Sequence, residues 1–219
     1  MVMIKKNKRK LILTSIIILL PILIGIILWG KLPDEIPTHW NAKGEVDGWS
    51  SKAFAVFGLP AFLFVVHWVC LLASNADPKK QNHSDKLLQL VFWICPVISI
   101  MIGILTYGTA LGVEFKVDKI LLVFVGLVFV IIGNYLPKCK QNYTIGIKLP
   151  WTLNDEENWN KTHRMGGKLW VISGFATMLC IFVPTNIMVL AFILILFLSI
   201  IIPTIYSYVI HKNKMKNGD

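Results

Sequence analysis

Long apolar runs alternate with shorter polar segments along this 219-residue chain. Most runs have the length of about 17 to 25 residues that an α-helix needs to cross the core of a bilayer. The fifth run is shorter, and we expect its helix to include residues 166–168, with Lys168 reaching toward the headgroups. The runs cover residues 11–29, 53–73, 87–111, 120–136, 169–183 and 187–210. The pattern predicts an all-α membrane protein with six transmembrane helices, and a composition that is 55% hydrophobic agrees with it.

The basic residues between the runs predict the orientation of the helices. Of the 22 lysines and arginines, 17 lie in the N-terminal segment, the second and fourth connections and the C-terminal tail. The positive-inside rule therefore predicts cytoplasmic N- and C-termini and an extracellular loop at residues 31–52. The first run is too long for a cleaved signal peptide and has no small-residue cleavage site, so we expect a retained anchor. The net charge of +10 is then a topology signal, and direct nucleic-acid binding is not expected.

Few chemically active residues lie inside the runs. His67 is the only ionisable side chain there apart from terminal residues and cysteines, and we expect a neutral imidazole bonded to a neighbouring helix, although a functional role stays open. Three cysteines lie in runs and Cys139 in a polar connection, with no zinc-ligand spacing. We expect no disulfide, cofactor, metal or enzyme activity. The connection at residues 74–86 has no apolar pattern and is interpreted as a plain cytoplasmic linker.

The long polar connection at residues 134–167 is the centre of the prediction. It combines tryptophans with Gly and Pro at fixed places, which is typical of an ordered functional loop rather than a disordered one. Thr152 followed by Asp155 predicts a short helix that begins near Thr152 and is capped by its hydroxyl. Pro150 predicts an extended arm over residues 146–150. The alternative is that the loop merely joins two helices and its tryptophans lie in the interface belt.

Within that connection, Trp159, His163 and Trp170 recur at helical spacing. They predict an interfacial helix that leads into the fifth span. Gly166 and Gly167 between them would let the helix backbone approach a neighbour closely.

The extracellular loop at residues 31–52 is divided by Pro and Gly into turns, and Trp40 and Trp49 are placed to lie in the outer interface. We expect a compact, hairpin-like loop against the membrane. His39 and Asp47 lack a metal-ligand pattern, so a metal site is not favoured. A loop ordered only by its prolines and tryptophans is the simpler interpretation.

Two stretches together resemble one family. LPDEIPTHWNAKGEVDGW is similar to a short extracytoplasmic domain of unknown function in small bacterial membrane proteins. GIKLPWTLNDEENWNKTHRMGGK resembles the signature of the SdpI family, the immunity and signalling proteins for the sporulation-delaying toxin. The resemblance covers nearly the whole chain and divides it into an N-terminal region, residues 1–111, and an SdpI-like region, residues 112–219, with a cytoplasmic loop at residues 137–168.

The resemblance implies a cell-membrane protein that protects its cell from a secreted antibacterial peptide toxin. It also implies that an ArsR-type repressor is held at the membrane by the cytoplasmic loop. The implied partner-binding residues are Gly146, Lys148, Pro150, Trp151, Thr152, Asp155, Glu156, Trp159, His163 and Arg164. The implied toxin-facing residues are Pro37, His39, Trp40, Gly44, Asp47, Gly48 and Trp49.

Two other functions are weighed against this one. A small peptide exporter coupled to ions would place charged groups in the spans, and the six runs contain no Asp, Glu, Lys or Arg. Uncoupled export stays open. A membrane enzyme would use Asp155, Glu156, His163 and Arg164 as acid, base and phosphate clamp. On one short helix these side chains point to different sides, which makes catalysis the least favoured function.

Overall fold

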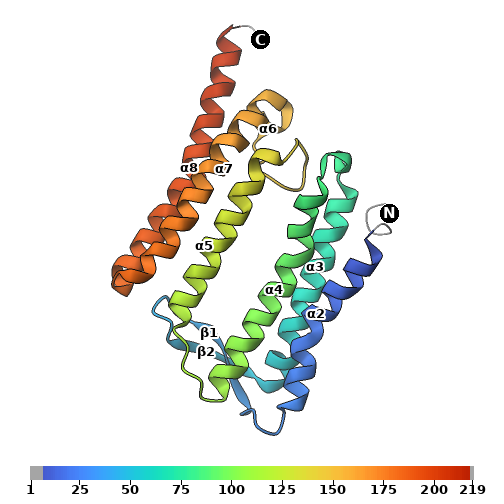
Figure 1. Ribbon diagram of the computed structural model, residues 1–219, viewed down its shortest axis with the longest axis vertical. Coiled ribbons are helices and arrows are strands. Elements are labelled where there is room, and N and C mark those ends of the chain that lie inside the picture. The colour runs from blue at the N-terminus through green and yellow to red at the C-terminus, as the bar shows by residue number, and fades with distance from the viewer. Residues whose placement is uncertain (1–6, 218–219) are drawn as a thin grey trace. The chain divides into compact units, whose positions relative to one another are not determined.

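The computed structural model describes residues 7–217 and contains six helices long and apolar enough to cross a membrane (Figure 1). The six predicted spans are confirmed, with bounds that shift by a few residues. The long helices are α2 (Lys8–Ile27), α3 (Leu59–Ala76), α4 (Asp85–Ala110), α5 (Val117–Tyr135), α7 (Glu156–Leu179) and α8 (Thr185–Asn217). The short elements are β1 (Glu35–Trp40), β2 (Val46–Ser51), the π-helical turn η1 (Phe54–Gly58), η2 (Lys80–Asn82), η3 (Leu136–Lys138), α6 (Pro150–Asn154) and η4 (Cys180–Phe182).

The chain forms two compact units. The first comprises Leu88–Asp118 and the described part of Met1–Ala76, and it holds α2, the two strands, α3 and most of α4. The second comprises Asp77–Leu87 and the described part of Lys119–Asp219, with most of α5 and all of α6, α7 and α8. The polar residues that follow α3 thus belong to the second unit, although α3 itself belongs to the first.

Buried polar side chains of the first unit bond across its helices. The Thr14 hydroxyl of α2 lies 3.1 Å from Nε2 of His67 in α3, and the fully buried imidazole confirms the expected contact with a neighbouring helix. From α4, the Ser99 hydroxyl donates to the Ile18 carbonyl at 2.7 Å, and the Tyr107 hydroxyl donates to the Pro21 carbonyl at 3.1 Å. Because lipid offers no hydrogen-bonding partner, such bonds fix how the helices pack.

The loop after α2 is a β-hairpin. Strands β1 and β2 pair antiparallel, with register shifts between Pro37 and Trp40, so the expected hairpin-like loop is confirmed and an otherwise helical fold gains a two-stranded sheet. The Asn41 side chain accepts from the Lys43 and Glu45 N–H groups and closes the turn. Ile36 is fully buried in an apolar cluster with Leu32, Ala55, Val56 and Tyr107, which attaches the hairpin to the helices.

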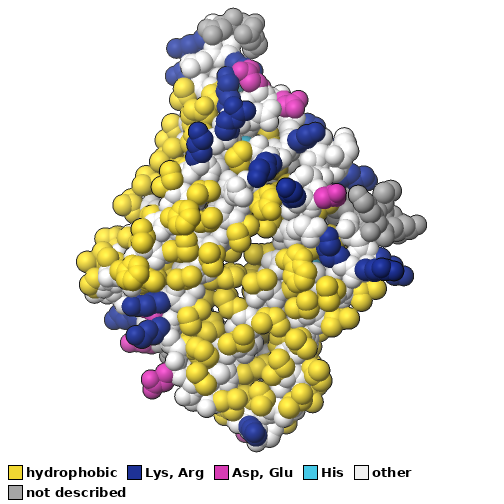
Figure 2. All heavy atoms as spheres, in the orientation of Figure 1, with side chains coloured by type: hydrophobic (Ala, Val, Ile, Leu, Met, Phe, Trp, Pro, Cys, Tyr) yellow, Lys and Arg dark blue, Asp and Glu magenta, His cyan; other side chains and the backbone are white. Residues whose placement is uncertain are grey.

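Helices α5 and α7 of the second unit approach each other at small residues. A side chain at Gly167 of α7 would lie 2.7 Å from the Gly133 carbonyl of α5, and one at Gly133 would lie 2.8 Å from the Gly167 carbonyl. This contact confirms the close approach expected of Gly167. Figure 2 shows apolar side chains over the spans, with Lys and Arg side chains gathered beside that apolar surface.

Candidate functional site

We call residues 136–155, which join α5 to α7, the connector. It begins with η3 and ends with α6, and between them it has no regular secondary structure. Its order comes from side chains that bond to the backbone, and several of these side chains lie outside the connector.

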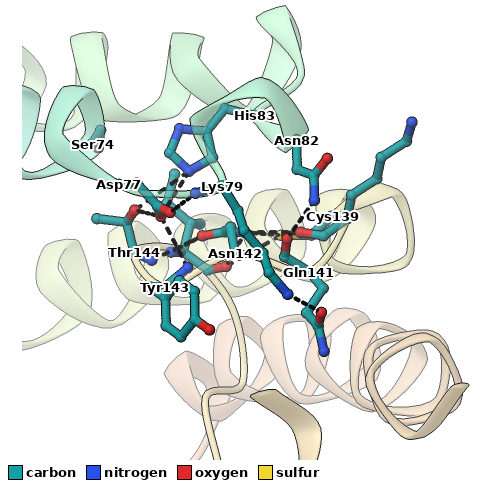
Figure 3. Close-up of polar contacts among 12 residues, drawn as sticks. Ser74, Asp77, Lys79, Asn82, His83, Cys139, Gln141, Asn142, Tyr143 and Thr144 are labelled. Atoms are coloured by element: carbon teal, nitrogen blue, oxygen red, sulfur yellow. Dashed lines mark hydrogen bonds and ion pairs between the residues drawn. The ribbon is translucent and has the colours of Figure 1, made fainter. Parts of the chain in front are cut away.

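The carboxylate of Asp77 holds the connector from the segment that follows α3 (Figure 3). Its Oδ2 accepts from the Tyr143 N–H at 2.9 Å and from the Thr144 hydroxyl, and it lies 3.3 Å from Nε2 of His83. Its Oδ1 accepts from the Lys79 N–H at 2.7 Å. The Asp77 and His83 side chains are both buried. Burial opposes ionisation, but the hydrogen bonds from Thr144, Lys79 and Tyr143 outweigh it, so the pKa of Asp77 lies below its ordinary value.

Gln141 makes a second junction between the same two segments. Its side-chain amide donates to the carbonyls of Thr152 and Leu153, at 2.8 and 2.9 Å. These carbonyls at the end of α6 would otherwise have no hydrogen-bond donor within the helix. Its Oε1 accepts from the Lys79 ammonium, and its own carbonyl accepts from the Asn82 side chain at 2.7 Å. One residue therefore links α6 to the segment after α3.

Asn142 and Cys139 shape the turn between these junctions. Asn142 is fully buried; its Oδ1 accepts from the N–H groups of Thr144 and Ile145, and its Nδ2 donates to the Ile145 carbonyl. The buried Cys139 thiol also donates to Ile145, at 3.2 Å. Burial raises the pKa of Cys139 to about 11, although the hydrogen bond from Asn142 opposes this. The thiol is therefore protonated and protected within the folded connector.

The connector packs against two residues of α7, Trp159 and His163. Their rings are stacked, with centroids 4.0 Å apart. The Trp159 indole donates to the Cys139 carbonyl at 2.7 Å. His163 Nε2 accepts from the Ile147 N–H at 2.9 Å, so the ring proton lies on Nδ1, which donates to the Trp159 carbonyl at 2.8 Å. Gly146 passes these rings with φ of 129°, and a side chain there would overlap both. The helical spacing of the two aromatic residues is confirmed.

The predicted helix start needs a correction. Helix α6 begins at Pro150, and Thr152 lies inside it, where its buried hydroxyl accepts from the Leu149 N–H and donates back into the arm. Proline fits a first helical position because its fixed φ is already helical, so the helix starts two residues earlier than predicted. The residues before Pro150 are non-helical and Leu149 is extended, as the predicted arm requires.

Asp155 caps the long helix α7 and ties it to α8. Its Oδ1 accepts from the N–H groups of Glu157 and Asn158, and its Oδ2 lies 2.9 Å from the Lys214 ammonium. Burial opposes ionisation of Asp155, but the bonds from Lys214 and from these two N–H groups outweigh it and lower its pKa. Helix α7 then continues without a break from Glu156 to Leu179, through the predicted fifth span.

Helix α8 supports the connector through polar and aromatic contacts. The Asn158 side chain of α7 donates to the Ser207 carbonyl at 2.9 Å and accepts from the Ser207 hydroxyl at 2.8 Å. The Trp151 ring of α6 packs edge-on against Tyr208 and stacks on His211, with centroids 5.6 and 6.0 Å away. Connector, α7 and α8 are thus one packed assembly.

The ten predicted partner-binding residues fall into three groups by exposure. Thr152, Trp159 and His163 are buried, while Gly146, Trp151 and Asp155 are half-buried. The exposed members are Lys148, Pro150, Glu156 and Arg164. Only the exposed and half-buried groups are available to a partner, and the buried group builds the scaffold that presents them.

The four residues weighed for a membrane enzyme are not joined by hydrogen bonds or ion pairs. Over residues 7–217, none of Asp155, Glu156, His163 and Arg164 makes a hydrogen bond or ion pair to another of the four. Both nitrogens of His163 are occupied by backbone groups. The histidine is therefore part of the scaffold and is not poised as an acid or base.

The seven predicted toxin-facing residues share the hairpin. Pro37 is buried; Trp40, Gly44 and Gly48 are half-buried; His39, Asp47 and Trp49 are exposed. Nδ1 of His39 lies 2.5 Å from Oδ1 of Asp47 across the strands. Trp49 leaves 57% of its surface uncovered, which makes it the large apolar side chain that the strands present outward.

The interpretation of residues 74–86 as a plain linker is wrong. Asp77, Lys79 and Asn82 anchor the connector, and His83 is buried beside it. The sequence interpretation missed them because a polar segment that bonds a distant backbone has the same composition as one that is solvated. The Asp-Pro step at residue 77 and the single histidine were the available signals.

Spans, hairpin and ordered connector define a multi-pass membrane protein. A family model described as the SdpI/YfhL protein family matches residues 138–207, from the connector into α8. A second family model, described as a domain of unknown function (DUF1648), matches residues 16–64, a range that contains the hairpin. The chain is 30% identical over 213 residues to "Immunity protein SdpI" of Bacillus subtilis (strain 168), covering 96% of this chain and 99% of that relative.

The chain therefore belongs to the SdpI family and is a multi-pass protein of the cell membrane, as the two sequence motifs indicated. No solved structure matches it.

Proposed function

We propose that this chain is a membrane immunity protein that protects its cell from a secreted antibacterial peptide toxin. The observation that carries the proposal is the similarity to an immunity protein over 96% of the chain, which includes the hairpin, the connector and all six spans. The connector is ordered by buried hydrogen bonds and the hairpin by its strand pairing and the buried Ile36, and this order supports a binding function for each.

The hairpin is the proposed toxin-facing surface. It is extracellular in the topology that the positive-inside rule favours. Trp49, His39 and Asp47 are its exposed members, and aromatic side chains such as that of Trp49 are enriched in protein interfaces. Pro37, Trp40, Gly44 and Gly48 hold the strands in the shape that presents them.

A survival assay tests immunity directly. The chain is expressed in a toxin-sensitive strain without its own immunity protein, purified peptide toxin is added, and survivors are counted. Trp49→Ala should lower survival roughly tenfold at equal protein level, because an exposed aromatic is a typical binding hot spot. Phe62→Ala is the matched control, since Phe62 is 64% exposed on the apolar helix α3. Equal survival with and without the wild-type chain would contradict the proposed function.

The connector, together with the first turns of α7, is the proposed docking surface for a cytoplasmic repressor of the ArsR type. Lys148, Pro150, Glu156 and Arg164 are exposed on a scaffold held by Asp77, Trp159 and His163. In the favoured topology this surface faces the cytoplasm, where a soluble repressor can reach it. A preformed surface loses little conformational entropy on binding, which supports a docking function.

Membrane recruitment tests the docking function. A fluorescently tagged ArsR-type regulator is scored as membrane-bound or dispersed in cells that carry the chain and are exposed to toxin. Arg164→Lys should release the regulator, because lysine keeps the charge but lacks the planar bidentate fork. Lys168→Arg, at another exposed position of α7, is the control and should change nothing. A regulator that stays dispersed with the wild-type chain would contradict docking while leaving immunity to the survival assay.

A further inference from the structure

Tyr143 is an exposed aromatic on a fixed backbone. Its side chain is 47% exposed, yet its N–H donates to buried Asp77, and its neighbours Asn142 and Thr144 are held by the bonds described above. The Lys79 ammonium lies 5.5 Å from the Tyr143 ring centre and also donates to Gln141, so this lysine is held in place as well. Figure 3 shows the ring directed away from the carboxylate that anchors its backbone.

The two segments that meet at Tyr143 carry an excess of basic side chains. Residues 77–87 and 136–145, which these contacts join, contain five lysines and two acids, the buried Asp77 and the exposed Asp85. We call Tyr143, with Lys79 at its ring and three further lysines of these segments, the Tyr143 patch; its members are Lys79, Lys80, Lys138, Lys140 and Tyr143. All lie on the second unit, and each is exposed or half-buried.

The buried carboxylate of Asp77 holds groups from both segments, the one after α3 and the connector. Asp77 gathers donors from Lys79, Tyr143 and Thr144, and therefore sets where the patch residues lie relative to one another. Attraction of anionic lipid needs only mobile basic charge, whereas a fixed aromatic with a fixed ammonium suits a shaped protein surface.

We propose that the Tyr143 patch binds an acidic segment of a cytoplasmic protein partner, and that Asp77 is the positioning residue that presents it. The inference rests on the docking function proposed for the connector, which it extends to the segment after α3. Tyr143 supplies the apolar contact, Lys79 and the other lysines of the patch supply the charge, and Asp77 acts only through the backbone and hydroxyl groups that it holds.

The test uses the full-length protein in neutral phosphatidylcholine nanodiscs. The probe is a fluorescein-labelled decaglutamate peptide, its neutral counterpart is decaglutamine, and binding is followed by fluorescence anisotropy. Tyr143→Ala should raise the Kd for decaglutamate roughly five- to tenfold without changing the net charge, as expected of an interface aromatic. Lys79→Ala should weaken binding similarly, whereas Lys43→Ala on the hairpin removes the same charge and should not.

Asp77 is tested through Thr144, which donates to its carboxylate. Thr144→Val removes the hydroxyl and should weaken decaglutamate binding, whereas Thr144→Ser keeps the hydroxyl and should restore wild-type binding. The two variants are compared at a temperature where both are fully folded by circular dichroism. Equal Kd values for Val and Ser at this position would show that Asp77 does not position the patch.

The remaining outcomes are also decisive. Equal binding of decaglutamate by Tyr143→Ala and wild type, or equal binding of decaglutamate and decaglutamine, would overturn the proposal. A Tyr143→Trp reporter whose emission shifts only when phosphatidylglycerol is added, without peptide binding, would assign the patch to lipid headgroups instead. Immunity is scored separately by survival, which Tyr143→Ala should leave unchanged. If the wild-type chain gives no survival but binds decaglutamate through Tyr143, the proposed immunity function is refuted and this inference still holds.

Discussion

Substitution of Asp77 by asparagine should open the connector, and the native thiol of Cys139 can report it. The change keeps the shape of the side chain but replaces one acceptor oxygen by an amide donor. If the remaining oxygen faces Tyr143 and Thr144, the new NH2 group faces the Lys79 N–H, donor against donor. The bonds that survive also lose their charged acceptor.

The size of the effect follows from these bonds. A hydrogen bond to a charged group contributes about 1.5 to 3 kcal/mol, and a neutral one about 1 kcal/mol. One bond is lost and two are weakened, while the neutral amide is less costly to bury, so local stability should fall by about 2 kcal/mol. The open population then rises about 30-fold, because each 1.4 kcal/mol is a factor of ten.

The assay is maleimide labelling of a parent in which Cys70, Cys95 and Cys180 are replaced by alanine. Cys139 is buried and its pKa is raised to about 11, so it should react slowly while the connector is closed. Asp77→Asn should speed labelling by the factor above. Asp47→Asn makes the same chemical change on the exposed hairpin and should leave the rate at the parent value. Equal rates for Asp77→Asn and the parent would refute the role given to this carboxylate.

Three further predictions concern backbone, pH and topology. Gly146→Ala should lower the thermal melting temperature, by an amount corresponding to about 2 kcal/mol or more, because φ is 129° and a side chain would overlap two rings; Gly30→Ala, with open space around it, is the control. Because the pKa of Asp77 is lowered by folding, its ionised form stabilises the fold above its ordinary pKa and less as pH falls through the lowered value. The melting-temperature gap between wild type and Asp77→Asn should therefore narrow below about pH 4. A membrane-impermeant maleimide on intact cells should label Lys43→Cys and not Asn154→Cys, both exposed; the reverse pattern would invert the predicted topology.

The sequence alone determined the features that depend on local composition. A bilayer demands long apolar helices wherever the chain crosses it, so the six spans are visible in the runs themselves. The shared helix face of Trp159 and His163 was visible as a helical spacing, since residues four apart lie on one face. The hairpin was visible as Pro and Gly punctuation. Each of these signals lies within a few residues of the structure that it predicts.

Tertiary structure decided the features that depend on partners far away in the chain. Asp77 bonds to Thr144, which is 67 positions later, and no local pattern separates such a carboxylate from a solvated one. Thr152 was expected to cap a helix, but the arm folds back over its hydroxyl and the true cap of α7 is Asp155. Polar side chains find whichever backbone groups the packed helices bring to them, and only the folded chain determines which groups those are.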